Sequence, residues 1–290
     1  MPTQALVPAI GRDALAYEDA RHPGRPLTIH TYRPAAHGPD DPVVLVQHGV
    51  KRNGDDYRDF WIEAAEKHRL LVVATTFGDA AWPKPESYNN GGIVAADATV
   101  TPRESWAYAI LPRVVEALRA GGVTRREKVR LFGHSAGGQF VHRLMATQDH
   151  SIYEAVACGN PGWYTLPTLE RAFPEGLGGL GMGDADLARW LACPMTILAG
   201  DQDISTTDEN LPRNPEALAQ GPTRFARAHF FFDRARREAA RLGVACRWSL
   251  VPVAGIGHDG CAMGKAAAAM WFEGRIPSAQ ELAPAATQVA

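Results

Sequence analysis

Short apolar runs alternate with longer amphipathic segments along most of the chain. Several of these runs are apolar at consecutive positions, as expected for strands buried on both faces of a sheet. The predicted strands cover residues 27–32, 43–47, 71–75, 129–132, 155–158, 195–199 and 247–251. Between them, apolar residues recur at helical spacing around 57–65, 106–118 and 140–145. This alternation predicts an α/β fold, with one mostly parallel sheet and helices on both of its faces.

Three segments interrupt this rhythm. Residues 78–104, 160–192 and 204–222 are predicted to be long loops, which in a compact fold usually serve function or move. The segment 160–192 carries a glycine cluster and is the candidate cap or insertion. Residues 276–290 are rich in Ala, Pro and Gln and are expected to fray. No repeat or linker divides the chain, so we expect a single domain over residues 1–290.

The composition is that of an ordinary globular protein, with 46% hydrophobic and 21% charged residues. The net charge of −2 gives no broad electrostatic reason to bind nucleic acid or anionic lipid. No apolar run approaches the length of a membrane span. The N-terminus lacks the pattern of a signal peptide, which predicts a cytoplasmic protein unless a longer form is exported. Cys158, Cys193, Cys246 and Cys261 lack zinc or redox spacing and are expected to be reduced and mostly buried.

The sharpest chemical feature is the sequence Gly-His-Ser-Ala-Gly at 133–137, which has the G-x-S-x-G form. It follows a predicted strand and opens an amphipathic helix, the context in which this motif forms a sharp turn with an exposed serine. Ser135 is therefore the candidate nucleophile. The backbone amide of Ala136, at the start of the helix, is a candidate donor to an oxyanion.

A serine nucleophile needs a base, and the base needs an orienting acid. Among the ten histidines, His258 alone follows a late strand within a glycine-rich turn, so it is the candidate base. The acid follows the strand at 195–199, where Asp203 is favoured and Asp201 remains the alternative. The second oxyanion donor is expected to be the amide of Val50, after the strand at 43–47. His48 beside it is expected to brace the loop rather than react.

Aromatic side chains in the long loops lie near the same predicted edge of the sheet. Tyr88, Trp163 and Tyr164 could form an apolar wall for an acyl or aromatic group, or could instead pin their loops to the body. Trp82 is expected to act as a pin. Residues 176–181 match G-x-G-x-x-G but follow no strand, so no dinucleotide site is predicted there. The sequence predicts no metal site and no cofactor.

The chain resembles the α/β-hydrolase superfamily from about residue 26 to 274. The resemblance rests on His48-Gly49, on the 133–137 motif, on Gly-Asp-Gln-Asp at 200–203 and on Gly-Ile-Gly-His-Asp-Gly at 255–260. Within the superfamily it is most similar to poly(3-hydroxybutyrate) depolymerase-like esterases of the LpqC type. That narrower likeness rests on residues 48–53, 56–57, 87–92 and 162–164.

The resemblance implies a serine esterase with Ser135 as nucleophile, His258 as base and Asp203 as the orienting acid. It implies the amides of Val50 and Ala136 as the oxyanion donors. The substrate would be a small or oligomeric ester or a 3-hydroxyalkanoate polymer, although these 290 residues predict no polymer-binding module. A feruloyl or acetyl esterase or a peptidase could use the same three residues. A non-catalytic binding protein is disfavoured because all three are present.

Overall fold

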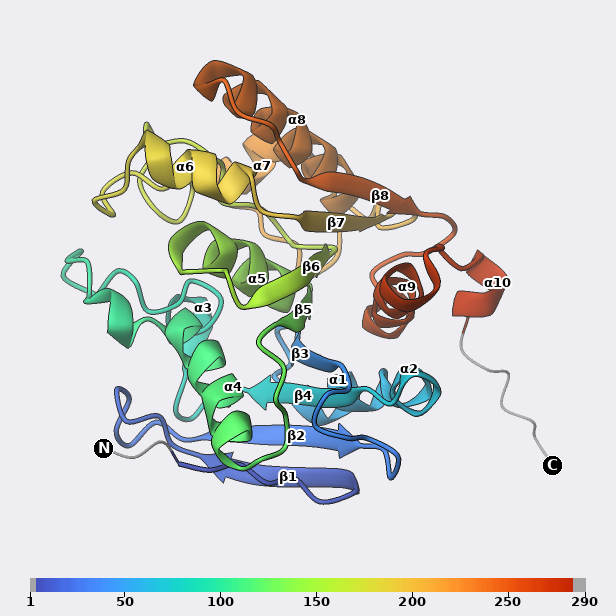
Figure 1. Cartoon of the computed structure of the whole chain (residues 1–290). Coiled ribbons are helices and arrows are strands. Elements are labelled where there is room, and N and C mark those ends of the chain that lie inside the picture. The colour runs from blue at the N-terminus through green and yellow to red at the C-terminus, as the bar shows by residue number, and fades with distance from the viewer. Residues whose placement is uncertain (1–3, 284–290) are drawn as a thin grey trace.

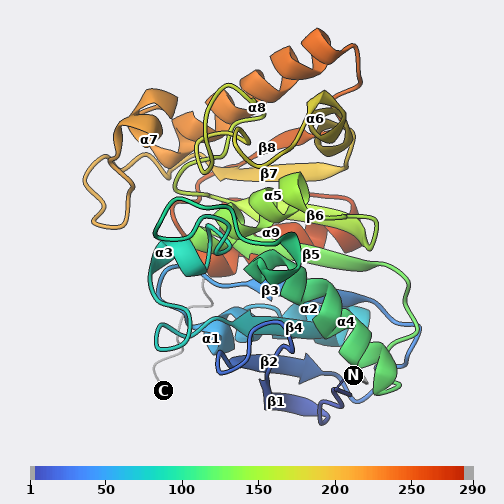
Figure 2. The same cartoon turned by 90° about the vertical axis from the view of Figure 1, so that its left-hand side faces the viewer.

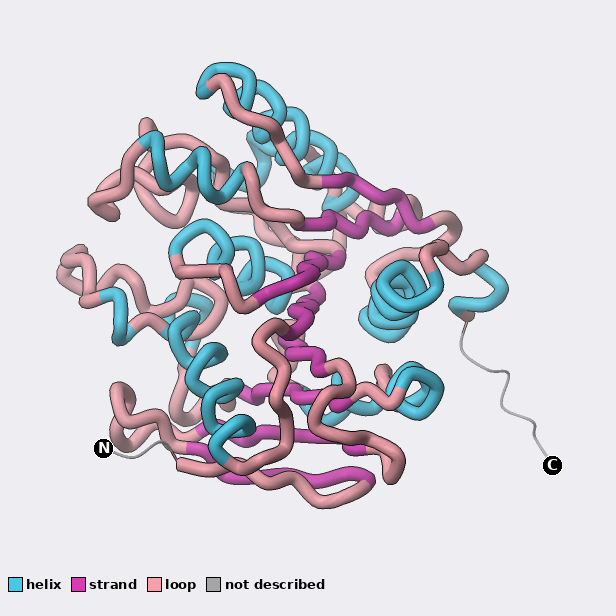
Figure 3. The backbone as a smooth tube through the Cα atoms, in the orientation of Figure 1, coloured by secondary structure: helices cyan, strands magenta, loops and turns pink. Residues whose placement is uncertain are grey.

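Eight strands form one sheet in the computed structural model, which describes residues 4–283. Their order across the sheet is β1-β2-β4-β3-β5-β6-β7-β8 (Figure 1), and Figure 3 shows the strands in magenta with cyan helices on either side. The strands are β1 Gly11–Tyr17, β2 Leu27–Arg33, β3 Val43–Gln47, β4 Leu71–Thr76, β5 Val129–His134, β6 Tyr153–Gly159, β7 Met195–Gly200 and β8 Ser249–Val253. β1 pairs with β2, and β2 with β4, in antiparallel fashion, and all other pairs are parallel. The predicted mostly parallel α/β sheet is confirmed.

Helices cover both faces of this sheet (Figure 1). The first group packs on a core that includes Leu45, Val73 and Leu131, and consists of α4 Ile110–Ala120, α5 Ala136–Thr147, α6 Asp184–Leu191 and α8 Arg224–Leu242. The second group packs on Val46, Val72 and Phe132 from the other side, and consists of α1 Gly54–Asp59, α2 Ile62–His68, α9 Gly260–Glu273 and α10 Ala279–Leu282. Residues that alternate along each central strand thus feed two separate cores, because successive strand side chains point to opposite faces.

Some element boundaries differ from the prediction. β1 was not predicted, because only Leu15 and Tyr17 among its inward positions are large apolar residues, and the alternate positions are exposed. It extends the sheet to Gly11, well before the core that the sequence placed at 26–274. The helix predicted around 57–65 is two short helices, α1 and α2, with a break at Phe60 and Trp61. β8 lies two residues later than the predicted 247–251 and runs through Pro252, which an edge strand tolerates.

The predicted loops contain short helices. α3 Lys84–Ser87 lies in 78–104, α6 in 160–192 and α7 Pro215–Gln220 in 204–222. The glycine cluster of the 160–192 segment packs against the core. Leu177 within it is fully buried, and its amide donates to the Thr168 carbonyl. Part of the tail expected to fray forms α10, and residues 284–290 lie outside the described part.

The parallel strands all end at one edge of the sheet. Figure 2 shows α1, α3 and α7, which follow β3, β4 and β7, gathered along that edge (left). Within residues 4–283 no helix combines the length and the apolar character needed to cross a membrane. All four cysteines are free thiols, with Cys158 and Cys193 buried and the other two half-buried.

Candidate active site

Ser135 lies at the apex of a sharp turn between β5 and α5. Its φ of 57° and ψ of −119° fall in a region that residues other than glycine seldom adopt, so the turn is strained. A Cβ at Gly133 would lie 2.2 Å from the Gly137 carbonyl oxygen, and a Cβ at Gly137 would lie 2.2 Å from the Gln47 carbonyl oxygen. Only glycine fits at either position. The motif at 133–137 is therefore explained by the close approach of the turn to itself and to the end of β3.

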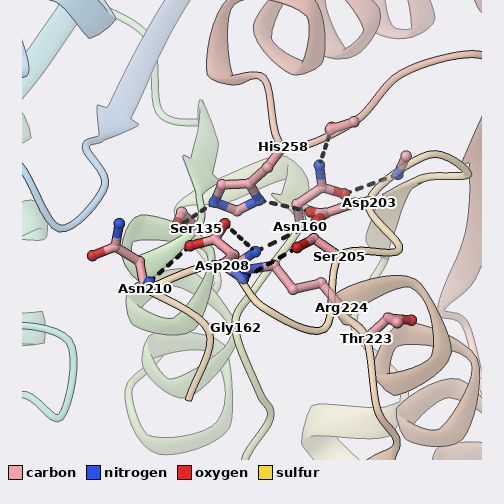
Figure 4. Close-up of polar contacts among 12 residues, drawn as sticks. Ser135, Asn160, Gly162, Asp203, Ser205, Asp208, Asn210, Thr223, Arg224 and His258 are labelled. Atoms are coloured by element: carbon pink, nitrogen blue, oxygen red, sulfur yellow. Dashed lines mark hydrogen bonds and ion pairs between the residues drawn. The ribbon is translucent and has the colours of Figure 1, made fainter. Parts of the chain in front are cut away.

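The structure brings Ser135, His258 and Asp203 together in a hydrogen-bonded chain (Figure 4). The Ser135 hydroxyl lies 3.0 Å from His258 Nε2, and His258 Nδ1 lies 2.7 Å from Asp203 Oδ2. His258 follows β8 and Asp203 follows β7, as the strand ends predicted. Asp203 is 2% exposed and Ser135 7% exposed, so both are shielded from bulk water. A proton on His258 Nδ1 leaves Nε2 free to accept from the serine.

The two candidate acids have different partners. Asp201 Oδ1 accepts a hydrogen bond from the Gly255 amide at 2.8 Å, which ties the end of β7 to the turn after β8. Asp203 alone contacts His258. Asn160 strengthens the same turn, because its side chain accepts from the Gly200 amide and donates to the Gly257 carbonyl. Sequence reasoning missed Asn160, which carries no motif and acts through two backbone contacts.

The amides predicted as oxyanion donors flank Ser135. A Cβ at Gly49 would lie 3.6 Å from the Ser135 Cβ, which places the loop after β3 against the serine. Ala136 is the first residue of α5, where an amide has no acceptor within its own helix. Among residues 4–283 neither the Val50 nor the Ala136 amide donates a hydrogen bond. Both amides thus remain available to an incoming ligand.

His48 holds the loop after β3 in place. Its Nε2 accepts from the Phe77 amide at 3.0 Å, so the proton lies on Nδ1, which donates to the Gly49 carbonyl at 2.9 Å. Burial lowers the pKa of His48 to about 3, and the ring is therefore neutral near pH 7. The expected bracing role matches these contacts.

His134 and Tyr57 form a second polar pair beneath the site, which sequence reasoning missed. The Tyr57 hydroxyl and His134 Nδ1 are 2.8 Å apart, and the His134 ring centroid lies 4.6 Å from that of His258. Burial holds the pKa of His134 well below its usual value, so the ring is neutral. In the sequence His134 stood out only as part of the 133–137 motif, and Tyr57 only as an apolar helix position and as part of the likeness at 56–57.

A hollow of about 260 Å³ opens beside Ser135 and His258. Its other walls are Gly49, Val50, Lys51, Asn53, Tyr57, Phe60, His134, Asn210 and Gly260. The loop after β3, the break between α1 and α2, and the segment after β7 therefore shape it. One cation, Lys51, stands among mostly neutral groups along this wall.

The three aromatic residues named as candidates for substrate binding do not line this hollow, and their contacts favour the alternative, that they pin their loops to the body. Tyr88 and Tyr164 are fully buried. The Tyr88 hydroxyl donates to the His48 carbonyl at 2.7 Å, and the Tyr164 ring stacks on Phe231. Trp163 is half-buried and lies over the Arg143 guanidinium. These loops pack onto the body through their aromatic rings, because removing a large ring from water is favourable.

Trp82 is a pin, as expected: it is 1% exposed and its indole donates to the Pro26 carbonyl. Arg143 supports the neighbouring loops from beneath. It is fully buried, and it donates to the Thr165 hydroxyl and to the Asn89 carbonyl. The long loops 78–104 and 160–192 are thus joined through one side chain of α5.

Comparisons with known proteins place this geometry among hydrolases. The chain is 55% identical to LpqC, a poly(3-hydroxybutyrate) depolymerase from Bordetella parapertussis, over 94% of this chain and 93% of that one, with a TM-score of 0.92. It is 33% identical to poly(aspartic acid) hydrolase-1 from Sphingomonas sp. KT-1, over 89% and 97% of the two chains, with a TM-score of 0.86. An S-formylglutathione hydrolase from Agrobacterium tumefaciens, 18% identical over 93% and 97%, shares the fold with a TM-score of 0.58. Neither the protein-family models nor the curated proteins gave a match.

Proposed function

Since this chain belongs to the poly(3-hydroxybutyrate) depolymerase-like family of α/β-hydrolase esterases, we propose that it cleaves 3-hydroxyalkanoate esters through an acyl-enzyme on Ser135. The chain is a carboxylic ester hydrolase. The observation that carries the assignment of residues is the contact of Ser135 Oγ with His258 Nε2 at 3.0 Å, beside an open hollow.

In the proposed reaction Ser135 attacks the ester carbonyl while His258 Nε2 accepts its proton. The Asp203 carboxylate holds the imidazole in position through Nδ1 and stabilises the imidazolium that forms. His258 then gives the proton to the departing alcohol. Water repeats the sequence on the acyl-enzyme, with His258 again as base, and frees the acid and Ser135.

The amides of Val50 and Ala136 are the proposed donors to the oxyanion. Each donor of this kind accelerates the reaction by roughly 10²–10³-fold. The amide of Ala136 also begins α5, whose N-terminal partial positive charge favours an anion there. Because His48 and Tyr88 fix the loop carrying Val50, this donor is set in place before substrate arrives.

The size of the hollow supports a short acyl unit. At about 260 Å³ it is smaller than the roughly 300–1,000 Å³ of pockets that enclose drug-sized ligands. An oligomer of 3-hydroxybutyrate would place one unit there and leave the rest of its chain over the surface. Such a substrate also fits the 55% identity to LpqC over almost the whole length of both chains.

Hydrolysis of an acidic polyamide is a second candidate. It is favoured by the 33% identity to poly(aspartic acid) hydrolase-1 and by the cation Lys51 on the wall of the hollow. An amide needs the same nucleophile and base, with an amine as the group that departs. The two candidates therefore differ in the bond cleaved and in the charge of the substrate.

The test compares the native chain with Ser135→Ala on p-nitrophenyl esters from acetate to decanoate, on 3-hydroxybutyrate trimers and on poly(aspartic acid). We expect turnover of short esters and of the trimer, and a loss of roughly 10⁴-fold or more in kcat for Ser135→Ala. A folded Ser135→Ala protein with near-native turnover would overturn the nucleophile. Cleavage of poly(aspartic acid) but not of the trimer would replace the first candidate by the second.

A further inference from the structure

A buried arginine stands behind the triad acid. Arg224, the first residue of α8, is 1% exposed, and its Nη1 lies 2.9 Å from Asp208 Oδ2 and 3.4 Å from Asp203 Oδ1 (Figure 4). Asp203 uses its other oxygen to hold His258. The Phe225 amide also donates to the Asp203 carbonyl, which fixes the start of α8 against the triad acid. Arg224 therefore faces two carboxylates, one of them in the triad.

Asp208 is held in place on several sides. Its Oδ1 accepts from the Asn210 amide at 2.7 Å, and its own amide donates to the Ser205 hydroxyl at 3.1 Å. Partial burial acts to raise the pKa of Asp208, but the contacts with Arg224 and the Asn210 amide outweigh it, so the pKa is lowered. The charge of His258 acts on this carboxylate as well. Asp208 is thus a second anion within electrostatic reach of the triad histidine.

Within the described part of the chain, the Arg224 side chain donates no hydrogen bond to a backbone carbonyl, so a purely structural role does not explain its burial. Its Nε and Nη2 have no hydrogen-bond partner among residues 4–283. Arg227, one turn later on α8, is equally buried but donates to the carbonyls of Gly162, Gly221 and Pro212. The contacts that Arg224 does make are to carboxylates. Keeping a buried cation with unpaired donors is costly unless its charge is needed.

We propose that Arg224 and Asp208 form a charge-compensating pair that positions Asp203 and limits the negative charge facing His258. The pair thereby sets the pH at which His258 becomes free to act as a base. This proposal rests on the serine-hydrolase function proposed above and adds two positioning residues to it. Neither residue is assigned contact with the substrate.

The sign of the effect follows from charge. Without Arg224, Asp208 and Asp203 both stabilise the imidazolium of His258, so the base form is lost at a higher pH. Without the Asp208 charge, Arg224 destabilises the imidazolium, and the base form persists to a lower pH. In a partly buried site with Asp203 between Arg224 and His258, each change is worth about one pH unit. Removing both charges together leaves the net charge that faces His258 nearly unchanged, so the pH at which the base form is lost stays near the native one.

Other groups also face His258, and they stay constant among the variants. The neutral ring of His134 packs against it from β5, with Tyr57 of α1 behind that ring. Asp259 follows it in the chain and caps α9 through the amides of Cys261 and Ala262. Lys51 lies across the hollow. A shift seen on changing Arg224 or Asp208 is therefore assigned to that pair.

The test measures the rate at which a fluorophosphonate labels Ser135 between pH 5 and 9, because this reaction needs the serine and its base but no knowledge of the substrate. The same pH series gives kcat/KM on p-nitrophenyl butyrate. The variants are Arg224→Met, Asp208→Asn and the double variant, with Arg227→Met as the matched control. In both pH profiles the acidic limb is the fall in rate as His258 becomes protonated at low pH. We expect this limb to move up by about one pH unit in Arg224→Met and down by a similar amount in Asp208→Asn. In the double variant it should lie near its native position.

Arg227→Met is expected to lose stability without moving the acidic limb. Unmoved limbs in both Arg224→Met and Asp208→Asn would overturn the proposal, and so would a shift of Asp208→Asn to higher pH. If Arg224→Met does not fold, Asp208→Asn alone decides the outcome. Its side chain is partly exposed, so this substitution disturbs the fold less. A native protein that labels normally yet cleaves no ester would contradict the proposed function and leave the charge pair to be judged by labelling.

Discussion

At the residue scale, the site depends on backbone positions that admit no side chain. Gly137 is one of them, because a Cβ there would lie 2.2 Å from the Gln47 carbonyl oxygen and 2.7 Å from that of His48. Both oxygens are backbone carbonyl oxygens, which cannot rotate away from the added atom as a flexible side chain could. A side chain at position 137 would therefore push α5 away from the loop that carries Val50.

We predict that Gly137→Ala lowers the free energy of unfolding by about 3 kcal/mol and lowers kcat at least tenfold. Urea unfolding and turnover of p-nitrophenyl butyrate measure the two effects. Gly78→Ala is the control, since a Cβ at Gly78 meets nothing within 4 Å, and a change within about 0.5 kcal/mol is expected. Equal stability of the two variants would show that the turn tolerates the extra atom.

Single residues also show how far the sequence could predict the site. Ser135 and His258 stand in motifs whose strand and helix context is visible in the chain, so both could be placed before the fold was known. The choice between Asp203 and Asp201 needed the contact with His258, because both acids follow the same strand. Arg224 and Asp208 lie in or beside a segment that the sequence marks only as polar. Their contacts with Asp203 and with each other depend on the path of the loop after β7, and hydrophobic periodicity does not predict the path of a loop.

At the scale of elements, the loop after β3 is supported by the segment after β4. The Tyr88 hydroxyl donates to the His48 carbonyl at 2.7 Å, and its ring stacks on the His48 imidazole. Tyr164 is buried to the same degree, but its hydroxyl has no partner among residues 4–283. The two tyrosines, both candidates from sequence for either a substrate wall or a loop pin, thus offer a matched pair.

We predict that Tyr88→Phe destabilises the protein by about 1–2 kcal/mol, because it leaves the buried His48 carbonyl without this donor. We expect kcat to fall severalfold with a smaller change in KM, because the loop that loses this contact carries the amide of Val50, the proposed donor to the oxyanion of the transition state. Tyr164→Phe should leave stability and both kinetic constants near native values. Steady-state kinetics on p-nitrophenyl butyrate and thermal unfolding test the pair. A rise in KM with kcat unchanged in either variant would instead favour substrate binding by that tyrosine.

The same scale explains which elements the sequence revealed. Central strands such as β3 and β4 are buried on both faces, so their apolar runs could be read directly. β1 lies at the edge of the sheet with exposed alternate residues, and its hairpin with β2 gives no apolar signal. Edge position also explains Pro252 within β8, a residue that sequence reasoning takes as the end of a strand.

At the scale of the whole molecule, three buried histidines make stability depend on pH. His48, His134 and His142 are each held neutral, since burial lowers the pKa of His48 to about 3 and those of His134 and His142 well below their usual value. Above about pH 6.5 the histidines of the unfolded chain are neutral too, so these three residues do not make the free energy of unfolding depend on pH there. Below that pH the unfolded chain binds protons that the folded chain refuses, and stability falls by about 1.4 kcal/mol per pH unit for each histidine.

We therefore predict that the free energy of unfolding drops by up to about 4 kcal/mol per pH unit between pH 6 and pH 5. His142→Gln should reduce this slope by about one third, because glutamine does not titrate and can still accept from the Thr165 amide as His142 does. His229→Asn, at an exposed position of α8, is the control and should keep the native slope. Urea unfolding at half-unit pH steps measures all three proteins. An unchanged slope for His142→Gln would mean that the buried ring takes up a proton without unfolding. The acid sensitivity would then have to come from the carboxylates around Arg224 and the ion pairs of the surface.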